Sequence, residues 1–187
     1  MSSIARKLAL LLAVYPFIVS GIAHANGGAG QDNGVSVNDL PADQITLNNG
    51  QVLHRAEVRT VPSQDKLSFG SWTQVIYRDD PVTALSGSCT VIYTTGTPGK
   101  VGTIAEAYSY VSVSAGCSSN VTWTNELKFN RTGAQWLRSQ APKQQTTVVG
   151  TTNDILMTSQ CLGTTPTNWR NEIVSASITD HVLACAR

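Results

Sequence analysis

Histidine and the familiar catalytic motifs are scarce in this chain of 187 residues. Beyond the first 25 residues, only His54 and His181 could act as an imidazole base. The chain has no Gly-x-Ser-x-Gly elbow, no His-Glu-x-x-His and no phosphate-binding glycine loop. Isolated histidines are more often structural or surface residues than catalytic ones. An enzyme is therefore the less favoured class, and we expect no cofactor and no metal site.

Long hydrophobic runs are also absent, apart from one at the N-terminus. There, a basic start is followed by an apolar run over residues 8–19 and by the small-x-small sequence that ends at Ala25. The run is shorter than a bilayer requires, and Pro16 interrupts it. The pattern predicts a cleaved signal peptide over 1–25. We expect a secreted protein, extracellular or periplasmic in a Gram-negative source, without stable membrane insertion.

The chain lacks an excess of charge of either sign. Loss of Arg6 and Lys7 with the signal peptide leaves eleven basic residues against twelve acidic ones. This balance argues against nucleic acid or an anionic membrane as the partner of the whole protein. Residues 26–44 have few large apolar side chains and are expected to form a flexible lead-in to a single domain over 45–187.

Four cysteines are present, and all of them follow the predicted signal peptide: Cys89, Cys117, Cys161 and Cys185. An even number in an exported protein favours two disulfides, and their wide spacing is unlike that of a zinc site. Three connectivities are possible. We prefer Cys89 with Cys117 and Cys161 with Cys185, because each pair closes a local, hairpin-like unit.

The strongest structural signal is period-two alternation over residues 88–130. Residues 89–93 resemble a buried strand, and alternation continues through 103–115 and 121–129. In 121–129, the apolar side chains fall on one face and the polar ones, including Glu126, on the other. In 103–115, the small residues from Ala105 to Val113 share one face. If these pack inward, Tyr108 and Tyr110 lie at or near the surface.

Further strands are expected throughout the rest of the domain. Asn49-Gly50 predicts a tight hairpin turn, and Thr94 to Lys100 has the composition of an exposed loop. Residues 132–140 fit either a short helix or a strand. The other expected strands are 67–77, 146–150, 155–162, 172–178 and 181–184. About nine or ten short strands predict an all-β fold, an antiparallel β-sandwich or partly closed barrel with two disulfides.

Aromatic residues give one candidate binding surface. Extracellular binding modules often use tyrosine and tryptophan as anchors against sugars or protein partners. Trp123 falls on the core face of its strand. The remaining candidates are Tyr108, Tyr110, Trp136 and Trp169.

Basic residues give a second candidate surface. No acidic residue occurs from Leu127 to Asn153, whereas Lys128, Arg131, Arg138 and Lys143 all lie there with Trp136 among them. Such a patch could hold an anionic glycan, a lipid head group or an acidic protein face. The alternative is an ordinary solvated face.

We therefore expect an extracellular recognition module for a carbohydrate or a protein. One alternative is a small hydrolase that uses two of Glu106, Glu126 and Glu172, although surface charge explains Glu126 and Glu172 equally well. Another is a toxin-like or inhibitor-like effector that uses the basic surface. Asn120 and Asn130 match the N-glycosylation pattern, which matters only in a eukaryotic source. No motif names a family, and the oligomeric state is left open.

Overall fold

A computed structural model describes residues 40–62, 70–79, 87–131 and 135–187. The predicted signal peptide, most of the predicted lead-in and residues 67–69 and 80–81 lie outside this part of the chain. The described residues form twelve strands and no helix. The strands are β1 (Gln44–Thr46), β2 (Val52–Pro62), β3 (Ser71–Arg78), β4 (Thr90–Gly96), β5 (Gly99–Val101), β6 (Ile104–Val113), β7 (Val121–Asn130), β8 (Leu137–Arg138), β9 (Lys143–Thr147), β10 (Thr152–Gln160), β11 (Gly163–Ile173) and β12 (Ser177–Ala186).

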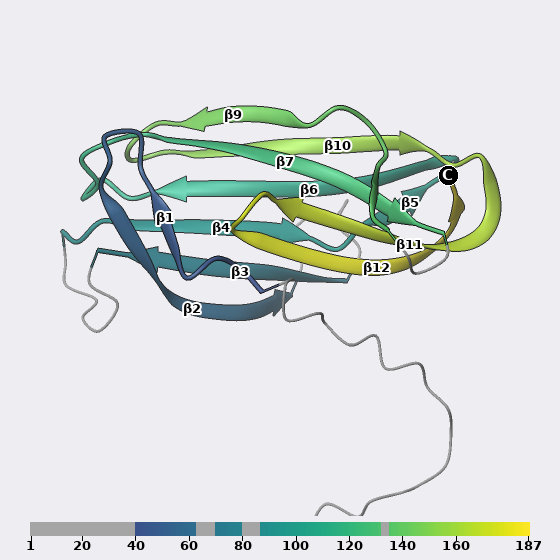
Figure 1. Ribbon diagram of the computed structural model, residues 1–187, viewed down its shortest axis with the longest axis horizontal. Helices are drawn as coiled ribbons and strands as arrows, with labels where there is room; N and C mark the ends of the chain where they lie inside the picture. The colour runs from purple at the N-terminus through teal and green to yellow at the C-terminus, as the bar shows by residue number, and fades with distance from the viewer. Residues whose placement is uncertain (1–39, 63–69, 80–86, 132–134) are drawn as a thin grey trace, which may run out of the picture. The chain divides into compact units, whose positions relative to one another are not determined.

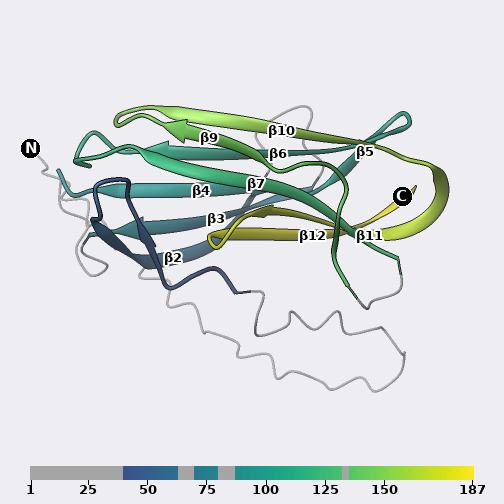
Figure 2. The ribbon, with the colours of Figure 1, turned by 45° about the horizontal axis from the view of Figure 1, so that its top comes forward.

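The strands build two antiparallel sheets (Figure 1). The larger has the order β1-β2-β3-β4-β6-β10 with β5 beside β6, and it curls into a half-barrel. The smaller has the order β12-β11-β7-β8, and β9 also pairs with β7. Strand β12 lies across β3 and β4, so the two sheets pack face to face (Figure 2). The predicted all-β antiparallel sandwich is confirmed.

Alternation places the core between the sheets. In β6, the small side chains from Ala105 to Val113 are buried, while Tyr108 and Tyr110 are half-exposed on the outer face, as the sequence predicts. The opposite sheet contributes larger side chains to the same core, namely Val121, Trp123, Leu127, Phe129, Trp169 and Ile173. Removal of this apolar surface from water stabilises the fold by about 25 cal/mol per Å².

The Asn49-Gly50 turn and the disulfide pairing are both as predicted. Gly50 has φ +89°, and its N–H donates to the Leu47 carbonyl oxygen at 2.9 Å. The disulfides join Cys89 to Cys117 and Cys161 to Cys185. Strand register places them at opposite ends of β6, because β4 begins opposite Val113 and β10 ends opposite Ile104.

The exposed loop predicted over Thr94 to Lys100 is wrong. Residues 94–96 belong to β4 and 99–100 to β5, and all of 94–99 are buried, whereas Lys100 is half-buried. Its polar composition is compatible with burial because the hydroxyl groups are paired. Thr95 is fully buried, and its Oγ1 lies 2.7 Å from Ser177 Oγ and 2.8 Å from Thr179 Oγ1.

The predicted strand over 172–178 is also wrong, since a turn at 174–176 separates β11 from β12 there. Ser175 occupies the left-handed region with φ 65°. Most of β11 was not predicted, because its polar composition and Pro166 lack a strand pattern; Pro166 lies at a register shift in the β11–β12 pairing. The ambiguous segment 132–140 contains only the short strand β8 among its described residues.

Candidate functional site

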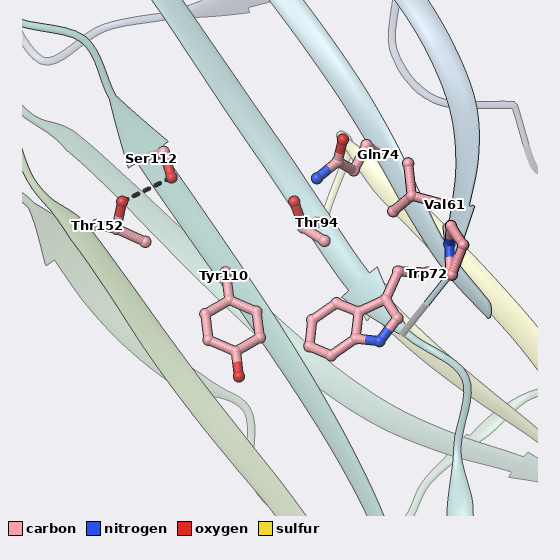
Figure 3. A pocket seen from close by; sticks show the side chains of 8 residues that line it. Val61, Trp72, Gln74, Thr94, Tyr110, Ser112 and Thr152 are labelled. Carbon is pink, nitrogen blue, oxygen red and sulfur yellow. Dashed lines mark hydrogen bonds between the residues drawn. The ribbon is translucent and has the colours of Figure 1, made fainter. Parts of the chain in front are cut away.

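Three aromatic rings form a row on the outer face of the larger sheet. Tyr108 and Tyr110 project from β6, with ring centroids 6.1 Å apart and planes at 13°. Trp72 projects from β3, and its ring centroid lies 4.9 Å from that of Tyr110. Figure 3 views the sheet from outside and shows the Trp72 and Tyr110 rings broadside. The row therefore crosses from β3 to β6, over β4.

Gly96 leaves the space that this crossing needs. It lies on β4 directly opposite Trp72. A Cβ atom at Gly96 would lie 3.3 Å from the Tyr108 carbonyl oxygen and 3.6 Å from Trp72 Cε2. A side chain there would push the indole away from the sheet. Trp72 is only 5% exposed and so acts as the fixed inner end of the row.

Beside the rings lies a hollow of about 430 Å³. It is lined by Val61, Pro62, Trp72, Gln74, Thr94, Tyr110, Ser112 and Thr152. The volume falls within the range of small-molecule sites. Figure 3 shows Gln74, Thr94 and the bonded Ser112–Thr152 pair around the rings. Aromatic faces next to hydroxyl and amide groups suit a ligand that is itself both apolar and hydroxylated.

Two polar groups in the hollow retain unused hydrogen-bonding capacity within the described part of the chain. Gln74 Oε1 accepts from Arg59 Nε at 2.9 Å, which leaves the Gln74 amide N–H groups to donate elsewhere. The Trp72 indole N–H is buried without a partner. A buried donor that lacks an acceptor carries a free-energy cost.

The backbone beneath the rings is held from inside the sandwich by Asn171. This residue of β11 is fully buried, and its Nδ2 donates to the carbonyl oxygens of Gly96 at 3.0 Å and Tyr108 at 2.8 Å. The two strands stop pairing at this point, since Thr95 opposite Ser109 is their last matched pair. Asn125 Nδ2 in turn donates to Asn171 Oδ1 at 3.0 Å. The amide of Asn171 thus spans both sheets and fixes the aromatic row from behind.

The predicted basic surface is largely neutralised. Lys128 Nζ lies 2.8 Å from a Glu126 oxygen and 2.6 Å from a Glu172 oxygen. Arg138 Nη2 lies 2.6 Å from the other Glu126 oxygen. The expectation that Glu126 is ordinary surface charge is wrong, because it is 3% exposed. Lys128 comes from the same strand as Glu126, and Arg138 comes from β8. Glu172 lies beside them because β11 pairs with β7. Alternation within one strand does not reveal such contacts between strands.

Electrostatics in this cluster oppose acid catalysis. Burial alone would raise the Glu126 pKa, but hydrogen bonds and charge from Arg138 and Lys128 outweigh it and lower the pKa. For Lys128, burial is likewise outweighed by both glutamates, and its pKa is raised. A general acid needs a raised carboxyl pKa. We define Glu126, Lys128, Arg138 and Glu172 as the ion-paired cluster, in which the lowered pKa of Glu126 does not suit a general acid.

The remaining basic and aromatic candidates have contacts of their own, and Trp136 lies beside Arg170, which is directly opposite Lys128 in the β11–β7 pairing. Trp136 is half-buried and lies against Arg170, whose guanidinium carbon is 4.2 Å from the indole centroid. Arg131 lies over the Phe129 ring at 5.8 Å. Lys143 Nζ donates to the Leu156 carbonyl oxygen at 2.8 Å, beside a second hollow between β9 and β10.

Trp169 belongs to the core rather than to a binding surface. It is 0% exposed, packs against Phe129 with ring centroids 5.9 Å apart, and donates from Nε1 to the Cys185 carbonyl oxygen at 3.0 Å. Of the four aromatic candidates, the structure brings together Tyr108 and Tyr110. It adds Trp72, which the sequence reasoning did not select. Trp72 is an odd number of positions from the buried Val75 and Tyr77 in the same strand, so alternation places it on the opposite face, and this was the available signal.

Other candidate residues do not form a centre. His54 and His181 are exposed on β2 and β12. Within the described ranges, no group of three or more His, Cys, Asp or Glu side chains could hold a metal ion. Asn130 is 6% exposed, whereas Asn120 is half-exposed and its Oδ1 accepts from the Val149 N–H at 3.1 Å.

Comparisons with protein-family models, curated proteins and solved structures give no match. Among the residues the structure describes, there is no helix of sufficient length and apolarity to cross a membrane. The function is therefore argued from the geometry of the site.

Proposed function

We propose that this protein is an exported carbohydrate-recognition module that binds glycans on the outer face of its larger sheet. The observation that carries the proposal is the row of Tyr108, Tyr110 and Trp72 beside a hollow lined with hydroxyl and amide groups. A sugar ring has an apolar face and a hydroxylated rim, and these two kinds of group complement it.

Several further features support binding rather than catalysis. Among the residues that the structure describes, the hollow beside the rings has no carboxylate in its lining, and the hollow between β9 and β10 has one, Asp154. The closest carboxylate pair, Glu126 and Glu172, is bridged by Lys128. Two disulfides suit an oxidising compartment, which agrees with export by the predicted signal peptide. The hydrolase and effector alternatives have no comparable geometric support.

The rigid backing of the rings also favours recognition. Trp72 is packed in place over Gly96, and Asn171 holds the Gly96 and Tyr108 carbonyls. A platform that is already ordered loses little conformational entropy when it binds. The half-exposed faces of Tyr108 and Tyr110 are then available as anchors at modest cost.

The test is the double variant Tyr108→Ala/Tyr110→Ala, assayed first on a glycan array and then by calorimetry with the best ligand. Removing two anchor rings should weaken binding by about tenfold or more, since truncated anchors typically cost more than about 1 kcal/mol each. The melting temperature should change little because both rings are half-exposed.

Trp136→Ala is the matched control, because Trp136 is a half-buried aromatic on the other sheet. It should leave glycan binding unchanged. Absence of any glycan ligand, or equal affinity of the double variant and the wild type, would refute the proposal.

A further inference from the structure

Among the residues that the structure describes, the side chains that line the hollow carry no formal charge. The lining contains three apolar or proline-type groups, one amide, one phenol and three hydroxyl groups: Val61, Pro62, Trp72, Gln74, Tyr110, Thr94, Ser112 and Thr152. Recognition of a carboxylate or sulfate group typically uses arginine, lysine or clustered N–H donors. The described part of the lining has no such cation, so these side chains offer hydrogen bonds but no counter-charge.

Charges near the hollow on the same face are mainly acidic. Asp154 lies directly opposite Tyr110 in the β10–β6 pairing. Glu106 lies on β6, two residues before Tyr108 and on the same face. Neither carboxylate forms an ion pair within the described part of the chain. An anionic ligand on this face would approach both carboxylates and be repelled.

The cations on this face do not offset that repulsion. Arg59 on β2 donates from Nε to Gln74, and its Nη1 lies 3.6 Å from a Glu57 oxygen, so Glu57 offsets its positive charge. Arg78 is at the end of β3, two pleats beyond Gln74. Neither arginine lines the hollow.

The hollow extends across the strands rather than along one of them. Its lining comes from β2, β3, β4, β6 and β10, which are consecutive neighbours in the sheet. Four spacings between neighbouring strands amount to about 19 Å. Such a span is longer than one sugar ring and matches a chain of several units.

We propose that the hollow binds an uncharged glycan chain laid across the strands from β2 to β10, and that Glu106 and Asp154 exclude acidic polysaccharides. This inference rests on the proposed function and specifies its ligand class. Repulsion by these two carboxylates excludes acidic chains, whereas the aromatic rings and hydroxyl groups bind neutral chains.

The test uses an array of neutral and uronic acid glycans of matched lengths, from two to six units, at low ionic strength. We expect binding of neutral chains that tightens with length, and at least about tenfold weaker binding of acidic chains of equal length. The double variant Glu106→Gln/Asp154→Asn should narrow this difference and leave neutral binding unchanged, with Glu57→Gln as a control on the same face.

Three results would overturn the inference while leaving the proposed function intact. These are equal or tighter binding of acidic chains, affinity that does not rise between two and six units, and a neutral-to-acidic ratio unaffected by the double variant. A failure to bind any glycan would instead reject the proposed function together with this inference.

Discussion

Glu126 lies on the outer face of β7 between two cations, Lys128 and Arg138. Its side chain is 4% exposed, so the carboxylate is nearly removed from water. Burial of an unpaired carboxylate would be costly, and the two ion pairs are what make this position tolerable. Glu172 completes the cluster by sharing Lys128. The same residue shows why a buried glutamate need not be catalytic.

The lowered pKa of Glu126 predicts a pH dependence of stability. A carboxyl group whose pKa is lower in the folded chain stabilises the fold fully above its unfolded pKa, about 4.3. That contribution is lost as pH falls through the folded-state pKa. The wild type should therefore lose melting temperature more steeply than Glu126→Gln between about pH 5 and pH 3. Parallel slopes in thermal melts of the two proteins would contradict this prediction.

At the scale of the strands, β4 and β6 stop pairing beneath the aromatic row, and Asn171 of β11 forms hydrogen bonds to both strands there. Asn171 supplies hydrogen bonds to Gly96 and Tyr108 that neighbouring strands would otherwise supply. Ser109 Oγ and the Asn125 amide complete a buried network in which Ser109 donates to Asn125 Oδ1 at 2.9 Å. A satisfied buried network gives a single well-defined arrangement of the strands above it.

Asn171→Leu should therefore weaken glycan binding as well as lower stability. Loss of its side-chain amide removes a buried donor from the Gly96 and Tyr108 carbonyls and loosens the backbone under Trp72 and Tyr108, at a cost on the order of 1–3 kcal/mol for each lost bond. Calorimetry with the array-selected ligand measures binding, and the carbonyl ¹³C shifts of Gly96 and Tyr108 report the lost bonds.

Thr147→Val is the matched control for this variant. It removes the buried acceptor of the Trp123 Nε1 proton, 2.9 Å away in the smaller sheet, and should lower stability without weakening binding. If Asn171→Leu and Thr147→Val both retained wild-type affinity, Asn171 would have no positioning role in the site.

At the scale of the whole sandwich, the two disulfides secure opposite ends of the sheets. Cys89–Cys117 joins the start of β4 to the β6–β7 connection, and Cys161–Cys185 joins the end of β10 to β12 in the other sheet. Their sequence separations of 28 and 24 residues are similar. In the chain-entropy model, both should therefore stabilise the fold to a similar extent.

Paired replacement of either disulfide by serines should lower the free energy of unfolding by up to about 3–4 kcal/mol. Urea denaturation of Cys89→Ser/Cys117→Ser and Cys161→Ser/Cys185→Ser, each against the wild type, provides the measurement. Unchanged urea midpoints in both variants would show that the non-covalent core alone maintains the sandwich.

The sequence by itself determined the strands with clear alternation, and it favoured, among three possible connectivities, the cysteine pairing that the structure shows. In β6 and β7, side chains alternate between a buried and an outer face, so inward and outward residues were predictable. The Asn49-Gly50 turn was predictable because few residues adopt positive φ as readily as glycine. Local pattern failed where polar residues are buried in hydrogen-bonded pairs, as at Thr95, and where β11 lacks alternation.

Only the tertiary structure decided which residues form the site. Trp72 meets Tyr110 because strand register sets Trp72 opposite Gly96 and Tyr110 opposite Thr94, two residues away on β4, and no spacing within one strand encodes that contact. Glu172 joins Glu126 and Lys128 for the same reason, since β11 is placed beside β7. Alternation is a local property of the backbone, whereas contacts between strands depend on sheet order and register.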